Sequence, residues 1–224
     1  MKRVAIVPAY NEEKNIEKVV DGLRNKVDEI IVVNDGSADR TGDILKNLDV
    51  ITVSHIANKG YGEAMKSGFR KGLQVGGDFF LLIDADLQHN PAESSRLMNS
   101  LIDNNYDMVI GSRFLDNKSK IPFTRKLGIH IFTILTKIFL GIRITDTQSG
   151  FRAFSRKALE KIIDFKRDGM GSSIEILYIA KKNNFRIKEV PISCSYDNVQ
   201  HSINPIAHGL QLTRTILSLY LRGI

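Results

Sequence analysis

The sequence is poor in cysteine. Its 224 residues include a single one, Cys194, so no internal disulfide can form and an all-cysteine metal site is impossible. We expect Cys194 to be a small, buried, apolar residue of a protein that works in a reducing compartment.

Long hydrophobic runs are also missing. No stretch approaches the ~20 uncharged apolar residues that a membrane-spanning helix needs, and the longest apolar segment, 128–142, contains His130 and Lys137. The N-terminus lacks the pattern of a signal peptide, because its short apolar run is broken by Pro8 and followed by Asn11-Glu12-Glu13. We therefore expect a cytoplasmic protein without a membrane-spanning segment.

Two nucleotide-binding motifs are absent as well. The first expected strand leads into Pro8-Ala9-Tyr10-Asn11-Glu12 rather than G-x-G-x-x-G, which argues against a dinucleotide-binding oxidoreductase. No G-x-x-x-x-G-K-[ST] occurs, so a P-loop NTPase is disfavoured. The net charge of +7 suits phosphates, nucleic acid or an anionic membrane surface. Because the basic residues are scattered and no aromatic stacking platform accompanies them, we expect no nucleic-acid binding.

What the sequence does contain is a regular alternation of short apolar segments and segments with helical periodicity. The expected strands cover 4–7, 29–33, 50–53, 79–83, 108–110 and 186–192. Asn11 is expected to cap the first helix, and Asn90, Pro91 and Glu93 are expected to begin another as cap, first residue and capping-box partner. Gly68 and Gly72 weaken their helix, so close packing or approach to a ligand is the expected reason for them. The alternation predicts an α/β fold with a mostly parallel, doubly wound sheet.

The strand Phe79–Ile83 stops at two carboxylates one residue apart, in Asp84-Ala85-Asp86-Leu87-Gln88. Two like charges so close repel each other unless a cation lies between them. Carboxylate oxygens suit Mg²⁺ or Mn²⁺, and Mg²⁺ is usually held by one or two carboxylates together with substrate phosphates. The stretch therefore predicts a metal–diphosphate site. The alternative is a solvated aspartate turn that caps a buried strand.

Polar side chains follow several other expected strands at the points where those strands end. They are Tyr10 and Glu12, Asp35, and Arg113, in addition to Asp84, Asp86 and Gln88. The C-terminal ends of parallel strands lie along one edge of a sheet, where open α/β sheets bind their ligands. We therefore expect these groups to converge on a binding cleft.

The motifs resemble, in their order, those of the inverting family-2 glycosyltransferases, and among these the dolichol-phosphate (polyprenyl-phosphate) mannosyl- and glucosyltransferases. The resemblance covers about residues 3–195. The motifs that carry it are 7–12, 32–37, 58–62, 84–88, 111–114, 146–154 and 189–192.

This resemblance implies a GT-A nucleotide-diphospho-sugar transferase fold and a nucleotide-sugar donor. It implies that the nucleoside is held by Pro8, Ala9, Tyr10, Glu12, Val33 and Asp35. Asp84, Ala85 and Asp86 would meet the ribose, the diphosphate and a Mg²⁺ or Mn²⁺ ion, with Gln88 as a further ligand on the metal side. Arg113 would face the phosphates of donor or acceptor, because arginine offers phosphate a planar, bidentate partner.

The acceptor side is expected to bind a polyprenyl or dolichyl phosphate. Asp86, Arg113 and Asp146 are the expected catalytic group, with Asp146 as a catalytic or orienting carboxylate on the acceptor side; the alternative for Asp146 is a turn residue. Arg152 is a second candidate for the acceptor phosphate, or else lies on a strand face. The basic pair of mannosyl members is absent after Val-Pro-Ile, so mannose, glucose and N-acetylhexosamine all stay open as the sugar. His201 either contacts phosphate or is a solvated loop residue.

Basic residues flank a broad apolar face in 127–142, the pattern of a helix that lies on a bilayer surface. Its apolar positions on one side are Ile129, Phe132, Leu135, Ile138 and Phe139, and Ile131, Ile134 and Leu140 widen that face. Residues 206–221 form a second amphipathic candidate, with Leu210, Thr213, Leu217 and Leu221 near one face. We expect peripheral contact with the inner face of the cell membrane. The alternative is that both helices pack on the domain or form the interface of a homo-oligomer.

The expected organisation is a single domain, 1–224. It divides into a nucleotide-sugar-binding half (1–113), an acceptor half with the interfacial helix (114–195) and an amphipathic tail (196–224). Two other functions stay open. One is a transferase of the same fold with a soluble or saccharide acceptor, which would need an enzymic base for a hydroxyl group. The other is a non-catalytic protein that binds nucleotide sugars.

Overall fold

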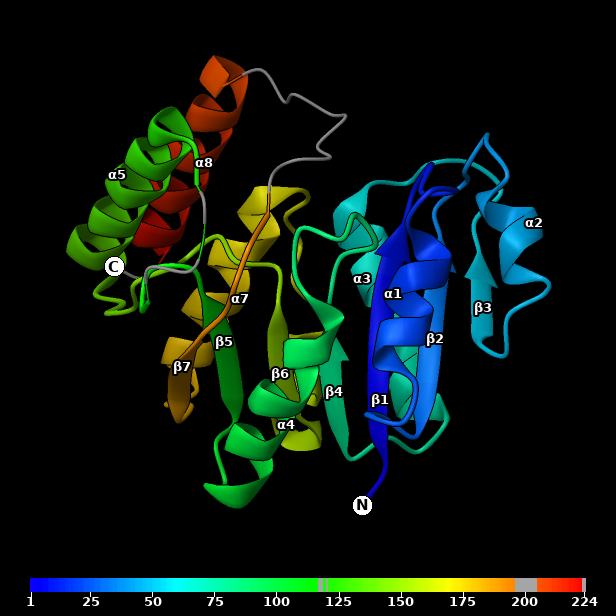
Figure 1. Ribbon diagram of the computed structural model, residues 1–224. Helices are drawn as coiled ribbons and strands as arrows, with labels where there is room; N and C mark the ends of the chain where they lie inside the picture. Colours follow the sequence, from blue (N-terminus) through cyan, green and yellow to red (C-terminus); the bar gives the residue numbers. More distant parts are fainter. Residues whose placement is uncertain (117–118, 120, 196–204, 223–224) are drawn as a thin grey trace.

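The computed structural model describes residues 1–116, 119, 121–195 and 205–222. Within them a seven-stranded sheet has the order β3-β2-β1-β4-β6-β5-β7, which Figure 1 shows from right to left. The strands are β1 (Arg3–Ala9), β2 (Glu29–Asn34), β3 (Ile51–Ser54), β4 (Phe79–Leu82), β5 (Met108–Ser112), β6 (Arg152–Ser155) and β7 (Ile187–Pro191).

The sheet is mostly parallel, as predicted, and β6 is the exception. It lies antiparallel between β4 and β5, with Arg152 opposite both Leu82 and Ile110. The chain returns to the sheet through a loop at the edge where β5 ends, and so enters β6 from that edge. The edge therefore gathers the C-terminal ends of β1, β2, β4 and β5 and the start of β6.

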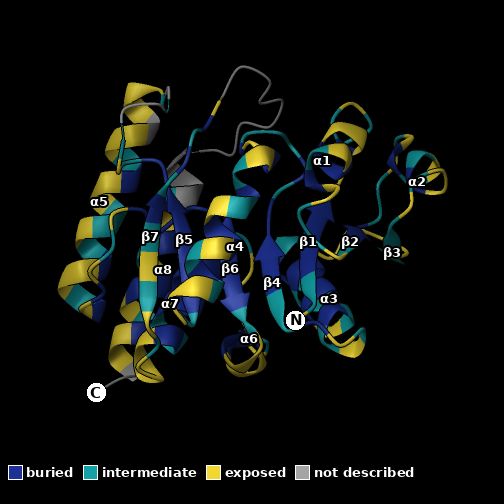
Figure 2. Ribbon diagram, turned by 60° about the horizontal axis from the view of Figure 1, so that its bottom comes forward, coloured by how far each residue is buried: buried dark blue, intermediate teal, exposed yellow. Residues whose placement is uncertain are grey.

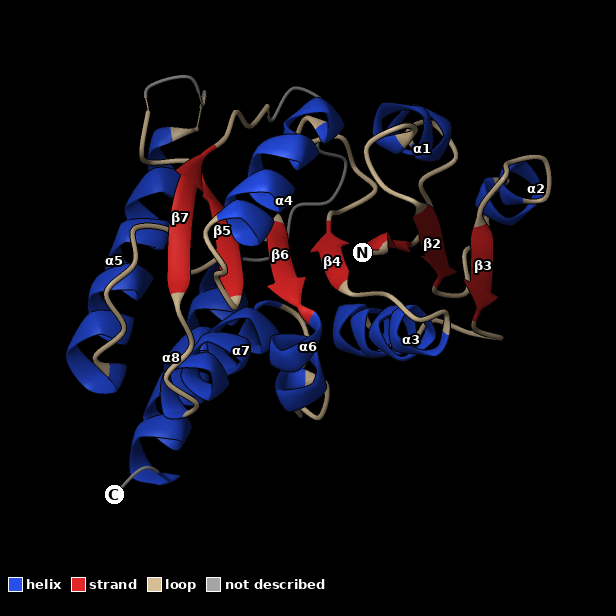
Figure 3. Cartoon of the chain, turned by 90° about the horizontal axis from the view of Figure 1, so that it is seen from below, coloured by secondary structure: helices blue, strands red, loops and turns tan. Residues whose placement is uncertain are grey.

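Helices cover both faces of the sheet (Figure 3). One face carries α1 (Ile16–Leu23), α2 (Thr41–Leu45), the 3₁₀ turn η1 (Pro91–Glu93) and α4 (Ser94–Asp103); the other carries α3 (Tyr61–Gln74), α6 (Arg156–Ile162) and α7 (Met170–Lys182). Successive strand residues point to opposite faces, so Val4 and Ile6 join the cluster under α3 while Ala5 and Val7 join the cluster under α1. This two-sided cover explains why the five inner strands are buried along most of their length, whereas the edge strands β3 and β7 are not (Figure 2).

The glycines of α3 let this helix lie close to the strands. A Cβ at Gly68 would lie 2.4 Å from Ile6 Cγ2, and one at Gly72 would lie 2.9 Å from Phe80 Cε1. Close packing, one of the two reasons predicted for these glycines, is therefore confirmed. It fixes the N-terminus of α3 at the sheet edge described above.

Two long helices, α5 (Phe123–Leu140) and α8 (Pro205–Arg222), lie side by side at the β7 end of the molecule and project past the edge where the parallel strands end (Figure 1). The rings of Phe139 and Tyr220 meet edge to face with centroids 5.5 Å apart. The inner side of α8 buries Leu212, Ile216 and Leu219. Among the described residues no helix is long and apolar enough to cross a bilayer.

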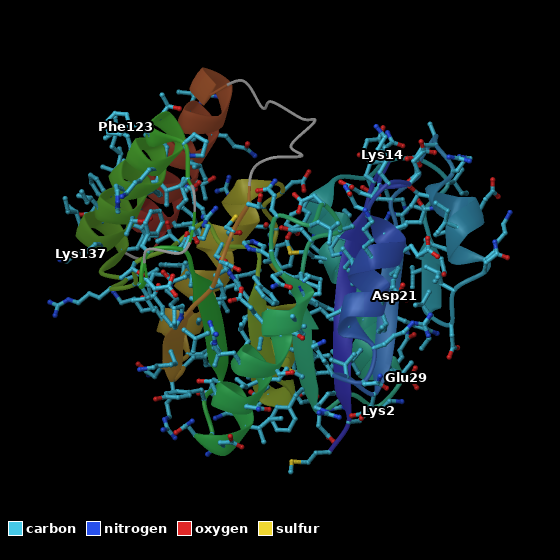
Figure 4. The ribbon with its side chains drawn as sticks, viewed as in Figure 1. Lys2, Lys14, Asp21, Glu29, Phe123 and Lys137 are labelled. Atoms are coloured by element: carbon cyan, nitrogen blue, oxygen red, sulfur yellow. The ribbon has the colours of Figure 1, made fainter. Side chains whose placement is uncertain are left out.

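The predicted single apolar face of α5 is wrong in its composition. Ile129 and Leu140 are buried and Phe132, Leu135 and Phe139 are half-buried, whereas Ile138 faces outward. The outward stripe consists of residues that are 47% to 78% exposed: Phe123, Leu127, Ile131, Ile134 and Ile138. The helix is apolar on two sides: one side packs on the protein, and the other faces outward. Figure 4 shows Phe123 and Lys137 near opposite ends of α5, on the outer side of the molecule.

Two predicted helix starts also need correction. Asn11 does not cap α1, which begins at Ile16; Asn11 has a positive φ of 56°, and its side chain accepts a hydrogen bond from Ala38 N at 2.8 Å. Asn90 does cap the next turn, through Ala92 N at 3.0 Å. Glu93, however, accepts hydrogen bonds from the backbone and hydroxyl of Ser193 and is not a capping-box partner.

Candidate active site

The predicted site residues gather at the sheet edge where β1, β2, β4 and β5 end. Asp84 and Asp86 follow β4, and Asp35 directly follows β2. Arg113 follows β5, and Asp146 lies in the loop that leads into β6. The expected convergence therefore follows from the strand directions.

Asp84 is held in a tight, partly buried position. Its Oδ1 accepts a hydrogen bond from the Tyr61 hydroxyl at 2.6 Å, at the start of α3. A Cβ at Gly150 would lie 2.4 Å from Asp84 Oδ2, so the loop before β6 also presses against this carboxylate. Burial and the charge of Asp86 raise the pKa of Asp84 to about 7. Burial, followed by the charge of Asp84, also raises the pKa of Tyr61 well above its ordinary value, so its hydroxyl stays a donor.

Asp86 lies in a turn rather than in a strand. Strand β4 ends at Leu82, and Leu87 has a positive φ of 59°. Asp86 Oδ1 accepts a hydrogen bond from Gln88 N at 2.9 Å, and Oδ2 accepts one from Gln88 Nε2 at 2.7 Å. Gln88 thus lies directly beside the carboxylate pair. Further along, Ser195 N donates to Gln88 O at 3.0 Å, and the backbones of His89 and the buried Cys194 form an antiparallel β-bridge. These contacts tie the loop to the segment that follows β7.

These residues fit a divalent cation in one particular way. Among the described residues, no three His, Cys, Asp or Glu side chains are clustered so that they could hold an ion alone. Burial, followed by the charge of Asp86, raises the pKa of Asp84, and a cation between the two carboxylates offsets both effects. A pair of carboxylates whose remaining ligands come from a diphosphate is the usual way to hold Mg²⁺. The donor set is oxygen-rich, which also suits Mn²⁺.

The residues expected on the nucleoside side occupy β1, β2 and their ends. Pro8 lies opposite Val33 in the β1–β2 register, and Ala9 lies next to it; all three are buried. Tyr10 is 42% exposed and so offers its ring to the outside. Glu12 Oε2 accepts a hydrogen bond from Asn15 Nδ2 at 2.8 Å, at the start of α1.

Arg113 and Asp146 form a buried bidentate ion pair. Arg113 Nε lies 2.6 Å from Asp146 Oδ2 and Nη2 lies 2.7 Å from Oδ1, and Arg113 N donates to the same carboxylate. Burial alone would raise the pKa of Asp146, but the charge and hydrogen bonds of Arg113 outweigh it, so the pKa is lowered. A carboxylate with a lowered pKa is a weak base. Of the two predicted roles for Asp146, the geometry favours orienting Arg113 over accepting a proton.

Glu189 on β7 supports this pair from behind. Its carboxylate accepts hydrogen bonds from Thr145 N at 2.8 Å, from the Thr145 hydroxyl at 2.7 Å and from Asp146 N at 3.0 Å. The loop that carries Asp146 is therefore held by β7, and Asp146 in turn holds Arg113.

The position of Arg152 argues against the predicted phosphate contact. Its side chain is buried, and its guanidinium donates to three backbone carbonyls, those of Thr147, Ser149 and Ser173, at 2.8–3.1 Å. These three hydrogen bonds hold the loop before β6 and the start of α7. The alternative prediction, a residue on a strand, describes it better.

Sequence reasoning gave no role to several residues that shape the site. Tyr61 donates to Asp84, Glu189 holds the Asp146 loop, and Asp168 Oδ1 accepts a hydrogen bond from Gly62 N at 2.5 Å at the start of α3. Tyr61 and Glu189 lie in motifs of the family resemblance, which was the available signal. His201 lies outside the described residues.

A surface hollow at the opposite edge of the sheet is separate from these groups. It is lined by residues that include Asp78, Tyr106, Arg156 and Arg186. Lys2 and Glu29 mark this same edge in Figure 4, while Lys14 lies at the other; Lys2 Nζ lies 3.2 Å from Glu29 Oε1. The arginines of the hollow bind main-chain carbonyls of Gly77 and Asn104, which accounts for them as structural residues.

The fold and the site define an α/β protein with an acidic pair and a buried arginine at the C-terminal edge of its sheet. Comparison with known proteins gives the same result at the level of sequence: the family model "Glycosyl transferase family 2" matches residues 4–163. The chain belongs to this family and is a glycosyltransferase, as the motifs predicted.

Two relatives and one solved structure illustrate the likeness. The chain is 37% identical over 212 residues to the UDP-N-acetylglucosamine–dolichyl-phosphate N-acetylglucosaminyltransferase of Methanococcus voltae, covering 85% of this chain and 84% of that one. It is 34% identical over 206 residues to the polyprenol monophosphomannose synthase of Mycolicibacterium smegmatis, covering 86% and 77%. The glucosyl-3-phosphoglycerate synthase of Mycobacterium tuberculosis superposes with a TM-score of 0.77 at 24% identity, covering 98% of this chain and 80% of that one. The expected GT-A fold is thereby confirmed.

Proposed function

We propose that this protein is a metal-dependent, inverting glycosyltransferase that moves a sugar from a UDP- or GDP-sugar to a polyprenyl or dolichyl phosphate. The observation that carries the proposal is the gathering of Asp84, Asp86 and Arg113 at one sheet edge, beside helices with exposed apolar side chains. Relatives that transfer sugars to dolichyl and polyprenyl phosphates support the acceptor class.

On the donor side, Pro8, Ala9, Tyr10, Glu12, Val33 and Asp35 hold the nucleoside, and Asp84-Ala85-Asp86 meets the ribose and diphosphate. The metal, Mg²⁺ or Mn²⁺, is held by Asp84 and Asp86 with Gln88 beside it, and when bound it neutralises the charge that develops on the leaving diphosphate. Structures of the mycobacterial synthase with Mn²⁺ or Mg²⁺ and UDP support this assignment by likeness of fold.

On the acceptor side, Arg113 holds a phosphate. A lipid phosphate has a second pKa of about 6, so its oxygen is already ionised near neutral pH and can attack the anomeric carbon directly. The attack displaces the nucleoside diphosphate from the opposite face of that carbon and inverts its configuration. The reaction then depends on positioning and charge stabilisation rather than on a protein base. This agrees with Asp146, whose lowered pKa suits the orientation of Arg113.

Membrane contact follows from a lipid acceptor. The outward stripe of α5, Phe123 to Ile138, and the exposed Leu210, Leu217 and Leu221 of α8 supply apolar surface for an interfacial position. Exposed basic groups on the same helices, Lys126, Lys137 and Arg214, favour an anionic headgroup layer. The protein would then work at the inner face of the cell membrane.

The acceptor is tested by following a labelled sugar from UDP- and GDP-linked donors into polyprenyl phosphate extracted with organic solvent, in parallel with soluble saccharides and phosphorylated glycerates. We expect label in the lipid fraction with Mn²⁺ or Mg²⁺, and loss of transfer in Asp86→Ala while the protein stays folded. Label only in soluble products would favour the transferase with a soluble acceptor. Absence of any product would favour a non-catalytic protein that binds nucleotide sugars.

The membrane position is tested by co-sedimentation with anionic phospholipid vesicles. The double variant Ile134→Glu and Ile138→Glu should lose most of its vesicle binding, since both side chains lie on the outward stripe. Ile56→Glu is the matched control, because Ile56 is fully exposed but follows β3 at the other end of the sheet. Equal binding of both variants would contradict the membrane role of α5.

A further inference from the structure

The carboxylate of Asp35 is engaged on both of its oxygens. Oδ1 accepts hydrogen bonds from His55 Nδ1 at 2.6 Å and from Lys59 N at 2.9 Å, and Oδ2 accepts one from Gly60 N at 3.0 Å. The side chains of Asp35 and His55 are only 5% and 7% exposed. The segment 55–60 therefore wraps the end of β2 and sets the direction of this carboxylate.

His55 is fixed in turn by α3. Its Nε2 lies 2.9 Å from the hydroxyl of Ser67, on the same helix that packs its Gly68 against β1 and β2. Because an ionised carboxylate can only accept, Nδ1 of His55 carries the proton that points at Asp35. In the neutral ring Nε2 then accepts a hydrogen bond from the Ser67 hydroxyl. The two hydrogen bonds therefore run in one direction, from Ser67 to His55 to Asp35, and they hold His55 in one tautomer.

Counting acceptor positions shows what this arrangement leaves for a ligand. A carboxylate has about four of them, two on each oxygen. His55 and Lys59 take both positions on Oδ1, and Gly60 takes one on Oδ2. One position, on Oδ2, remains for a nucleobase.

Nucleobases differ in how many donors they present on one edge. Guanine presents two adjacent donors, N1–H and the N2 amino group, and both oxygens of a carboxylate are needed to accept them. Uracil and thymine present a single donor, N3–H, between two carbonyls. A carboxylate with one open position matches the second pattern, and guanine would leave a polar N–H without a partner beside a carboxylate whose side chain is only 5% exposed.

We infer that His55, anchored by Ser67, is a specificity-determining residue that fills one oxygen of Asp35 and thereby selects a pyrimidine-2,4-dione base over guanine in the donor. The inference rests on the proposed function for its nucleotide-binding edge. His55 acts through Asp35 and is a positioning residue rather than a catalytic one.

Binding of nucleoside diphosphates to the full-length chain in Mn²⁺ tests this directly. Isothermal titration should give a dissociation constant at least about tenfold lower for UDP than for GDP. The dUDP arm separates the base from the ribose: dUDP should also bind more tightly than GDP, and a gap between UDP and dUDP measures the ribose 2′-hydroxyl. GDP binding as tight as UDP, or tighter, would overturn the inference.

The outcomes separate this inference from the proposed function. If GDP binds more tightly and GDP-sugars support transfer to polyprenyl phosphate, the proposed function stands and the base selection falls. If no nucleoside diphosphate binds, both fall. If UDP is preferred but the label goes to a soluble product, the base selection stands and the proposed acceptor falls.

The role of His55 is isolated by a matched pair of variants. His55→Leu keeps the bulk but frees a position on Oδ1, so the UDP-to-GDP affinity ratio should fall to below about threefold. His55→Asn places an amide nitrogen at the position of Nδ1, so it keeps the donor for Asp35 and should restore most of the ratio. Because both nucleotides share the ribose and diphosphate contacts, a general loosening of the site would lower both affinities and leave their ratio unchanged.

Ser67→Ala gives a milder test should His55→Leu fail to fold. It removes only the anchor on Nε2 and should narrow the ratio by about twofold to threefold, with a melting temperature close to that of the unmodified protein. A UDP-to-GDP affinity ratio that stays the same in both Ser67→Ala and a folded His55→Leu would overturn the role assigned to Ser67 and His55.

Discussion

The pKa of Asp84 predicts that the substitution Asp84→Asn stabilises the metal-free protein. In the folded protein burial and Asp86 raise this pKa to about 7, whereas the ordinary value is 3.8. Asparagine has nearly the same shape, carries no charge and can still accept the hydrogen bond that the Tyr61 hydroxyl donates at 2.6 Å. The substitution therefore removes the cost of burying a charge and the repulsion with Asp86, and it leaves the packing in place.

The magnitude follows from linkage between protonation and folding. A shift of about 3 pH units, at 1.36 kcal/mol per unit, corresponds to a ceiling of about 4 kcal/mol. Asp84 is partly exposed, so we take about half, roughly 2 kcal/mol. For a chain of this size, 2 kcal/mol corresponds to a rise of about 4–8 °C in melting temperature.

The pH dependence has a defined sign. Between pH 3.8 and about 7 the unfolded carboxyl is ionised while the folded one is still protonated, so the unfolded state binds fewer protons. Stability of the unmodified protein therefore falls as the pH rises through this window, and the full cost is present above about pH 7. The advantage of Asp84→Asn should be largest at pH 8 and should fall to about half of that or less at pH 4.5.

Thermal unfolding in EDTA at pH 4.5, 6 and 8 measures this difference. Adding Mn²⁺ and UDP should reverse the order at pH 8, because a ligand at 100 times its dissociation constant adds about 2.7 kcal/mol to a protein that binds it. Equal melting temperatures at pH 8 in EDTA, or a difference that does not change with pH, would refute the reasoning.

Three further predictions concern the neighbours of this site. Asp146→Ala should lower the free energy of unfolding by about 3–5 kcal/mol, since it takes the carboxylate away from a buried guanidinium; a loss below about 1 kcal/mol in urea unfolding would argue against a stabilising pair. Tyr61→Phe should move the midpoint of Mn²⁺-dependent transfer to higher pH, because the Tyr61 hydrogen bond holds the pKa of Asp84 down; a pH–rate profile with an unchanged midpoint would speak against this. Gly150→Ala should weaken activation by Mn²⁺, because its Cβ would lie 2.4 Å from Asp84 Oδ2, whereas Gly128→Ala, with nothing within 4 Å, is the control that should behave normally.

The buried Arg113–Asp146 pair shows that two motifs far apart in the sequence form one unit in the folded protein. In the sequence, Arg113 and Asp146 lie in separate motifs, and each motif by itself indicates a site residue. In the structure Asp146 orients Arg113, and Glu189 holds the loop that carries Asp146. Arg152, by contrast, donates hydrogen bonds to three backbone carbonyls and so supports the loop before β6.

The alternation of strands and helices along the chain, the apolar core and the clustering of Asp35, Asp84, Asp86 and Arg113 at one edge could be predicted from the sequence alone. Period-two and period-3.6 patterns are local, and parallel strands must place their C-terminal ends together. The family also followed from short motifs in a fixed order, and the family model confirmed it.

Tertiary structure alone decided the antiparallel direction of β6, the outward stripe of α5 and the partners of each charged group. An apolar helix such as α5 has no local signal that tells which of its apolar sides will be packed, because this depends on where α7 and α8 arrive. Likewise His55, Tyr61 and Glu189 lie 20 to 43 residues from the groups they hold, and only folding brings such distant donors and acceptors within hydrogen-bond distance. Sequence determined which groups meet at the edge of the sheet, and the long-range contacts determined what each of them is free to bind.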